Sequence, residues 1–155
     1  KRYTHLPQVF LGAAFSWSIP MAYTAVGEPL GLTCWLLYFG NLAWTVAYDT
    51  QYAITDREDD LKIGVKSTAI LFGRFDIQII ALLQAVSVIL IGTALYLENL
   101  LFSFGLIALL VVVVDFIYQW SKTKDKDPQR CFLAFRHNRW VGLIIFAGIF
   151  LELTI

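Results

Sequence analysis

The chain has 155 residues, of which 58% are hydrophobic and only 15% are charged. A soluble domain of this length is expected to be nearer half apolar and a quarter charged, so the composition indicates an integral membrane protein. The formal net charge is zero, which gives no argument for binding nucleic acid. The two cysteines, Cys34 and Cys131, lack the spacing of a zinc site, and we expect both to be structural.

Long apolar runs predict an all-α, polytopic transmembrane helical bundle forming a single membrane domain over residues 1–155. A spanning helix needs about 20 mostly apolar residues. We expect about five spans, the first kinked by Pro20, at residues 6–26, 30–47, 77–97, 100–120 and 141–155. The second span is expected to continue as a polar helix through an aspartate-rich stretch. Residues 63–72 read as a short interfacial or re-entrant helix, and residues 121–140 as a polar loop with a short helix.

The basic residues predict the orientation of these spans. All 12 Lys and Arg residues lie at positions 1–2, 57–74 or 122–139. The positive-inside rule then makes the N-terminus, the 53–76 loop and the 121–139 loop cytoplasmic, with the C-terminus outside. The sequence begins at Lys1-Arg2 without an initiator methionine, and we expect it to be a piece of a longer polypeptide.

An acidic stripe stands out in the stretch between residues 48 and 73. At about 100° per residue, Asp49, Asp56 and Asp60 fall within roughly 40° of one another on a helix. Carboxylates this close repel each other unless a cation lies among them, and hard oxygen ligands suit Mg²⁺. The spacing alone leaves a second interpretation open, in which the stretch is a solvated acidic loop at the membrane surface.

The amino-acid sequence of this stretch resembles a motif of a known family. Residues 48–73 read YDTQYAITDREDDLKIGVKSTAILFG, which is similar to the second aspartate-rich motif of the UbiA family of intramembrane aromatic prenyltransferases. The likeness is closest to the 4-hydroxybenzoate polyprenyltransferases of ubiquinone biosynthesis. KRYTHLPQVFLGAAFSWSIPMA at the start and NRWVGLIIF near the end also resemble that group. The resemblance covers the whole chain, at about the C-terminal half of such an enzyme.

The resemblance implies a nine-helix bundle in which two facing aspartate motifs each help to bind Mg²⁺ and a prenyl diphosphate. The matching positions of the second motif are Asp56 and Asp60, which are the expected metal-binding and catalytic residues. The first motif, N-D-x-x-D, has no counterpart in this chain. We therefore expect the chain alone to be inactive without the missing N-terminal half of the same enzyme.

The implied reaction transfers a polyprenyl group from polyprenyl diphosphate to 4-hydroxybenzoate, ortho to its hydroxyl group. Breaking the C1–O bond leaves an allylic cation and a diphosphate anion, whose charge metal ions and cationic side chains stabilise. An apolar cavity shields the cation from water. The candidate substrate-binding residues are Arg2, Asp49, Lys62 and Lys66.

Three alternatives stay open. The acidic cluster could line a cation path in a transporter or channel, although transporter sites usually lie at mid-bilayer. A prenyltransferase could act on another aromatic acceptor, and the chain could be an assembly subunit without chemistry of its own. In each case we expect a multi-pass protein in a lipid bilayer, for the enzyme a bacterial inner membrane or the mitochondrial inner membrane.

Several polar residues are expected to have no part in the chemistry. We expect Arg57 and Arg74 to be membrane anchors and His137 to be a surface residue, and we assign no role to Asp115, which lies near the end of the fourth expected span. Ser67 is a candidate cap for the interfacial helix.

Overall fold

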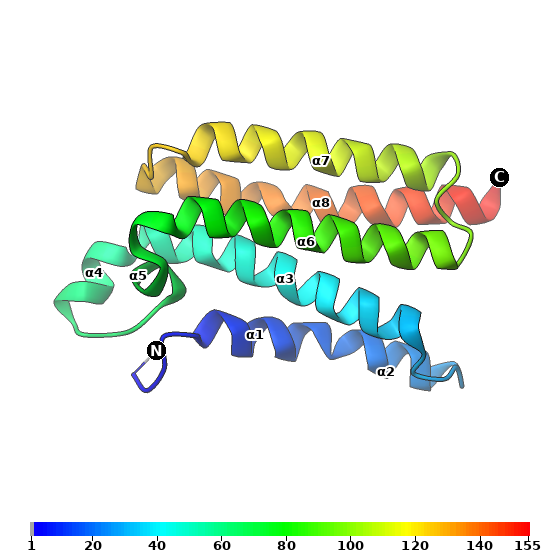
Figure 1. Ribbon diagram of the computed structural model, residues 1–155, viewed down its shortest axis with the longest axis horizontal. Coiled ribbons are helices and arrows are strands. Elements are labelled where there is room, and N and C mark those ends of the chain that lie inside the picture. The colour runs from blue at the N-terminus through cyan, green and yellow to red at the C-terminus, as the bar shows by residue number, and fades with distance from the viewer. Residues whose placement is uncertain (1) are drawn as a thin grey trace.

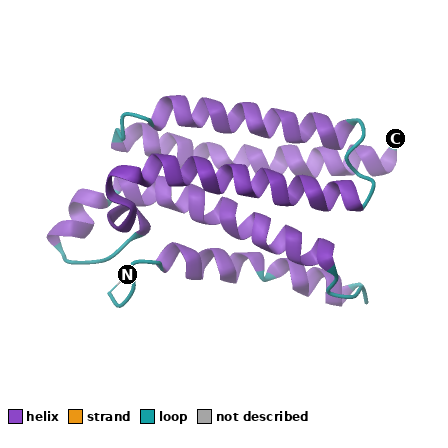
Figure 2. Ribbon diagram, in the orientation of Figure 1, coloured by secondary structure: helices purple, strands orange, loops and turns teal. Residues whose placement is uncertain are grey.

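Long helices lying side by side dominate the computed structural model, which describes residues 2–155 (Figure 1). Lys1, expected to anchor the first span, lies outside the described residues. Figure 2 shows helices joined by short loops, as expected for an all-α protein. The elements are α1 (Pro7–Ser16), α2 (Ser18–Ala25), α3 (Leu32–Thr55), α4 (Arg57–Lys62), α5 (Thr68–Phe72), the 3₁₀ turn η1 (Gly73–Phe75), α6 (Asp76–Leu97), α7 (Phe104–Thr123) and α8 (Pro128–Thr154).

Helix α3 is the centre of the arrangement, because it packs against α1, α6 and α8, while α7 packs against α6 and α8. The four long helices α3, α6, α7 and α8 form one bundle, and α1 and α2 cover the remaining side of α3 (Figure 1). Contacts at the end opposite α4 hold the bundle ends together. Thr33 donates a hydrogen bond to Glu98 across α3 and α6, and Glu152 accepts one from the backbone N–H of Gly105 across α7 and α8.

The first expected span is divided into α1 and α2, with the break at Trp17. Pro20 explains the position of the break, because proline lacks an N–H and its ring clashes with the carbonyl four residues earlier. That carbonyl belongs to Ser16, the last residue of α1. The buried Ser16 hydroxyl accepts a hydrogen bond from Asn41 of α3 at 2.9 Å, which fixes the break against the bundle.

The second expected span and its polar extension form α3, but the helix ends earlier than expected. Asp56 separates α3 from α4, and α4 then ends at Lys62, two residues before Gly64. Gly64 has φ +69°, and hydrogen bonds from the N–H groups of Gly64 and Val65 reach back to Leu61 and Asp60, as in a Schellman cap. The expected helix over 63–72 is therefore wrong in its first half, and only α5 forms.

The expected polar loop over 121–140 is also wrong. Only a short turn separates α7 from α8, and α8 runs unbroken from Pro128 into the last expected span. Asp127 caps α8 by accepting a hydrogen bond from the N–H of Arg130 at 2.8 Å, and Pro128 occupies the first turn, where its missing N–H costs nothing. Further along, Gly148 permits close packing on α7, because a Cβ there would lie 2.4 Å from that of Ala108.

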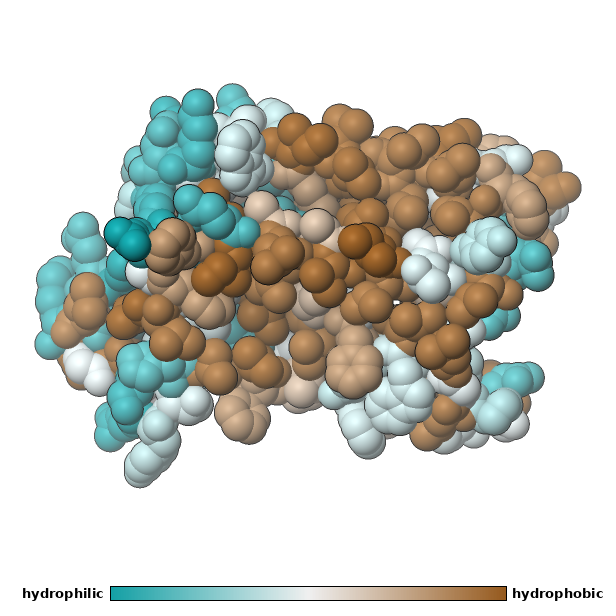
Figure 3. All heavy atoms as spheres, in the orientation of Figure 1, coloured by the Kyte–Doolittle hydropathy of each residue, from teal (hydrophilic) through white to brown (hydrophobic). Residues whose placement is uncertain are grey.

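The surface of the bundle is strongly apolar. Two segments, Thr68–Leu97 and Phe104–Thr123, are long and apolar enough to cross a bilayer by length and composition. Large hydrophobic side chains such as Ile89, Val114 and Phe146 point outward. Figure 3 shows that hydrophobic residues cover most of the visible face, with polar residues gathered most densely at the end that carries α4 and the α7–α8 turn. A face of this kind suits contact with lipid rather than water.

Candidate functional site

The three aspartates of the acidic stripe lie along the end of α3 and the beginning of α4. Asp49 is partly buried in α3, Asp56 is partly buried at the junction, and Asp60 is buried in α4. The helical hydrogen-bond pattern continues through the junction, because the N–H of Asp60 bonds to the carbonyl of Asp56 at 2.8 Å. The one-turn relation between Asp56 and Asp60 that the spacing predicts is therefore present in the backbone.

The expected cationic residues come from two parts of the chain. Lys62 is exposed at the end of α4 and donates a hydrogen bond to Asp59 at 2.9 Å, which raises the pKa of Lys62 and keeps it charged. Lys66 is partly buried in the loop between α4 and α5, and Arg2 is exposed near the chain start. The loop that carries Lys62 and Lys66 is thus close in sequence to the aspartates, while Arg2 comes from another part of the chain.

Polar contacts hold the beginning of α5 against α1 and α3. The N–H of Thr68 donates to Gln8 of α1 at 3.1 Å, and the hydroxyl groups of Thr68 and Thr50 lie 2.8 Å apart. Ser67 caps α5 as expected, since its hydroxyl accepts from the N–H of Ile70. These contacts fix the far end of the loop that carries the lysines.

A buried carboxylate forms a clasp beneath the same loop. Asp76, at the start of α6, is fully buried and pairs with both Arg57 and Lys126. Lys126 Nζ lies 2.7 Å from Asp76 Oδ1 and also donates to the carbonyl of Arg74, and Arg57 donates to the carbonyl of Ala69. This Arg57–Asp76–Lys126 clasp joins α4, α6 and the α7–α8 turn. Arg57 is therefore a structural ion-pair partner and not simply the membrane anchor that the sequence suggested.

Aromatic side chains form a wall between α3 and α8. The ring centroid of Tyr52 lies 5.1 Å from that of Phe135, and Tyr48 lies 5.9 Å from Phe135 and 5.7 Å from Trp44. A pocket of about 310 Å³ opens beside this wall and includes Trp44, Tyr48, Phe135 and Arg136. Tyr48 precedes Asp49 directly and Tyr52 follows it by three residues, so the aromatic wall and the acidic stripe share the last turns of α3.

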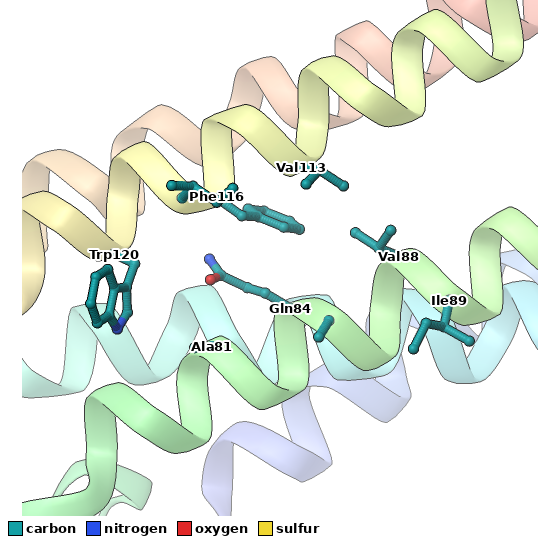
Figure 4. Close-up of a pocket in the computed structure, with 9 residues that line it drawn as sticks. Ala81, Gln84, Val88, Ile89, Val113, Phe116 and Trp120 are labelled. Carbon is teal, nitrogen blue, oxygen red and sulfur yellow. The ribbon is translucent and has the colours of Figure 1, made fainter.

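A second pocket, of about 410 Å³, lies between α6 and α7 and is almost entirely apolar. Figure 4 shows Gln84 pointing from α6 towards α7, with Phe116 and Trp120 on the opposite helix. The aspartates do not line this pocket. It is therefore separate from the acidic stripe and offers no group for phosphate or metal chemistry.

Asp115 and His137 are 22 positions apart in the chain, but the structure brings them together. His137 Nδ1 lies 2.9 Å from Asp115 Oδ1, and Gln119 donates to the other oxygen of the same carboxylate at 2.7 Å. The His137 contact is close but is not an aligned hydrogen bond. Asp115, to which we assigned no role, and His137, which we expected at the surface, therefore belong to one polar group between α7 and α8.

A metal ion at the acidic stripe would need ligands from outside this chain. Within residues 2–155, no three His, Cys, Asp or Glu side chains are placed so that they could hold a metal ion together. Mg²⁺ commonly binds through one or two protein carboxylates and completes its octahedron with water and substrate phosphate. The carboxylates of Asp56 and Asp60, one helical turn apart, fit a partial site of this kind.

The fold and the acidic stripe define an all-helical membrane protein with a carboxylate motif at one end of a four-helix bundle. The model of the UbiA prenyltransferase family matches residues 1–148, and the chain belongs to this family. Its members are membrane-embedded, which agrees with the apolar outer surface. No solved structure matches the chain.

The curated relatives include three proteins named 4-hydroxybenzoate octaprenyltransferase. The protein from Acinetobacter baylyi is 80% identical over 149 residues, which cover 96% of this chain and 51% of the relative. Those from Pasteurella multocida and Histophilus somni are 54% identical over 156 residues and 56% identical over 149 residues; the matches cover 98% and 96% of this chain and 53% and 52% of the relatives. The chain thus spans about half the length of the curated relatives it matches.

Proposed function

We propose that the full-length protein transfers a polyprenyl group from polyprenyl diphosphate to 4-hydroxybenzoate, ortho to the hydroxyl group, in ubiquinone biosynthesis. The observation that carries this proposal is the 80% identity to a protein named 4-hydroxybenzoate octaprenyltransferase. The match covers 96% of the chain and therefore includes the aspartate motif. The bacterial source of these relatives favours the bacterial inner membrane as the location.

This chain would supply one half of the reaction site, with Asp56 and Asp60 holding Mg²⁺. The metal, when bound, neutralises charge that builds on the leaving diphosphate. Lys62 and Lys66, on the loop that begins at α4, are placed in sequence to contact the phosphate oxygens, and Asp49 and Arg2 complete the substrate-binding set. The preceding half of the protein, which is outside this chain, would supply the first aspartate motif and the opposite wall.

The aromatic wall between α3 and α8 supports the same reaction. An allylic cation reacts with water unless the site excludes it, and the rings of Tyr48, Tyr52 and Phe135 pack together between α3 and α8. The faces of aromatic rings attract cations, by about 0.5–2 kcal/mol depending on how well the site is desolvated. The wall would therefore both exclude water and favour the cationic intermediate until it meets the acceptor ring.

Isothermal titration tests the proposal on the full-length protein reconstituted in lipid. The titrant is a non-hydrolysable polyprenyl diphosphate analogue, added with and without Mg²⁺. An enzyme of this kind binds the analogue with Mg²⁺ and loses most of the affinity without it. A transporter or channel with an acidic cation site would instead bind the divalent cation with no effect of the analogue, and that result would contradict the proposal.

A further inference from the structure

A cluster of buried amide side chains lies inside the four-helix bundle, towards the end that carries α4. Each long helix contributes one member. The members of this amide cluster, with exposed fractions of 1%, 3%, 1% and 4%, are Gln51 of α3, Gln84 of α6, Gln119 of α7 and Asn138 of α8. Burying a polar side chain in an apolar bundle costs free energy unless it forms hydrogen bonds. The four amides are therefore expected to bond to one another.

Gln119 is the hub of the amide cluster. Its side-chain oxygen accepts hydrogen bonds from Gln51 at 3.0 Å, Asn138 at 3.1 Å and Gln84 at 3.3 Å. Its amide nitrogen donates to Asp115 at 2.7 Å. A carboxylate only accepts hydrogen bonds, so Asp115 sets the orientation of the Gln119 amide and turns its oxygen toward the other three helices.

Helix α3 is attached to this cluster at two points. The indole N–H of Trp44 donates to Asn138 Oδ1 at 2.8 Å, and Asn138 Nδ2 donates to Gln51 Oε1 at 3.0 Å. Trp44 and Gln51 are about 20° apart around α3, whereas Asp49 and Asp56 are about 160° and 140° away from Gln51. The face of α3 that carries Trp44 and Gln51 is therefore nearly opposite the face that carries the aspartates. Hydrogen bonds that hold the first face in place also set the direction in which the aspartates point.

We propose that Gln51, Gln119 and Asn138 are positioning residues that hold α3 in the rotation required for Asp56 and Asp60, which directly follow its end, to bind the metal–diphosphate group. This inference rests on the proposed function. With carboxylate oxygens about 5–6 Å from the helix axis, a rotation of about 20° would move them by about 2 Å. Mg²⁺ requires nearly ideal octahedral geometry at about 2.0–2.1 Å, and a misplacement of about 1 Å can cost on the order of a hundredfold in rate.

A purely structural role gives a different expectation. Hydrogen bonds between helices in membranes contribute modest stability, and the Gln51 and Gln84 side chains are equally buried in the same cluster. If the amides only stabilise the bundle, replacing either should lower the melting temperature alike and leave the metal requirement unchanged. Gln84 bonds to Gln119 but has no hydrogen bond to α3 among the described residues, which makes it the matched control.

The test compares Gln51→Leu and Gln84→Leu in the full-length protein in lipid nanodiscs, with the exposed Gln78→Leu as a surface control. Mn²⁺, a paramagnetic stand-in for Mg²⁺, is titrated with a polyprenyl diphosphate analogue and followed by electron paramagnetic resonance. Steady-state turnover is measured against Mg²⁺ concentration, and melting temperature by intrinsic fluorescence. We expect Gln51→Leu to weaken Mn²⁺ binding and raise the half-saturating Mg²⁺ concentration at least tenfold, with both glutamine controls within twofold of wild type.

Equal effects of Gln51→Leu and Gln84→Leu on Mn²⁺ binding, or no effect of either, would overturn the inference while leaving the proposed function intact. A wild-type protein that binds no Mn²⁺ with the analogue would contradict the proposed function itself. If Gln51→Leu does not fold, Trp44→Phe decides the matter, because it keeps an aromatic side chain at this position and removes the N–H that donates to Asn138. We expect it to weaken Mn²⁺ binding about threefold or more, and binding equal to wild type would overturn the inference.

Discussion

Removing the carboxylate of the Arg57–Asp76–Lys126 clasp should open the end of the bundle that carries the acidic motif. The change is Asp76→Asn in the full-length protein. Breaking a buried ion pair by removing one partner costs about 3–5 kcal/mol, because the remaining charge is left without compensation. The Arg57 and Lys126 side chains are 24% and 31% exposed and keep hydrogen bonds to backbone carbonyls, so solvent screening reduces the expected cost to about 2 kcal/mol.

Cys131 reports this opening directly. It is fully buried in the first turn of α8, outside the expected span at 141–155, and burial together with the nearby Asp76 raises the pKa of its thiol to about 11. The thiol therefore reacts with a maleimide only when this end of the bundle opens, and its rate follows the open population. A cost of about 2 kcal/mol corresponds to roughly 30-fold faster labelling.

Labelling is measured near neutral pH in a Cys34→Ser background, with Asp125→Asn as the matched control. The ion pair between Asp125 and Arg130 is exposed, at 3.3 Å, so its loss should leave the rate unchanged. An Asp76→Asn rate within twofold of the parent would refute the reasoning that the clasp holds this end closed. Equal acceleration by Asp125→Asn would refute the claim that burial of the pair is what matters.

Three other predictions concern the site, the topology and the chain itself. Asp56→Ala or Asp60→Ala in the full-length protein should remove nearly all turnover at unchanged melting temperature, since losing a metal carboxylate costs several kcal/mol of transition-state stabilisation; near-normal turnover at saturating Mg²⁺ would disprove the assignment. Cysteines introduced at Glu28 and Glu98 should react with impermeant reagents only from the periplasmic side, and cytoplasmic labelling would overturn the five-span topology. The chain expressed without the preceding half should bind less of the Mg²⁺–diphosphate analogue than the full-length protein, and equal affinity would show that one motif is sufficient.

Local sequence signals predicted the fold where the cause was local. Apolar runs predicted the bodies of α3, α6 and α7, and Pro20 predicted a disturbance in the first span, which appears as the break after Ser16. The loop expected at 121–140 is helical at both ends because many of its charged residues lie on the ends of α7 and α8. The Asp127-Pro128 pair, a cap followed by a proline in the first turn, is a helix-start signal that would have corrected it.

The part of the candidate site that lies on one continuous helical stretch was predictable from the sequence. The spacing of Asp56 and Asp60 gave their one-turn relation, which the backbone retains across the junction of α3 and α4. The clasp and the amide cluster were not predictable, because they join residues far apart in the chain. Gln84 and Gln119 were visible as isolated amides in apolar runs, but nothing in the sequence indicated that Gln51 and Asn138 meet them.

The proposed reaction is tested most directly by following radiolabelled 4-hydroxybenzoate in membranes from a bacterial host whose own 4-hydroxybenzoate prenyltransferase is deleted. The assay contains polyprenyl diphosphate and Mg²⁺ and compares the full-length protein, this chain alone, and this chain co-expressed with the preceding half. We predict prenylated product from the full-length protein, none from this chain alone, and partial recovery on co-expression, because inserted helices can associate laterally by packing and hydrogen bonding. Product from this chain alone would show that the site is complete without a second metal-binding motif, and absence of product from the full-length protein would contradict the proposed reaction.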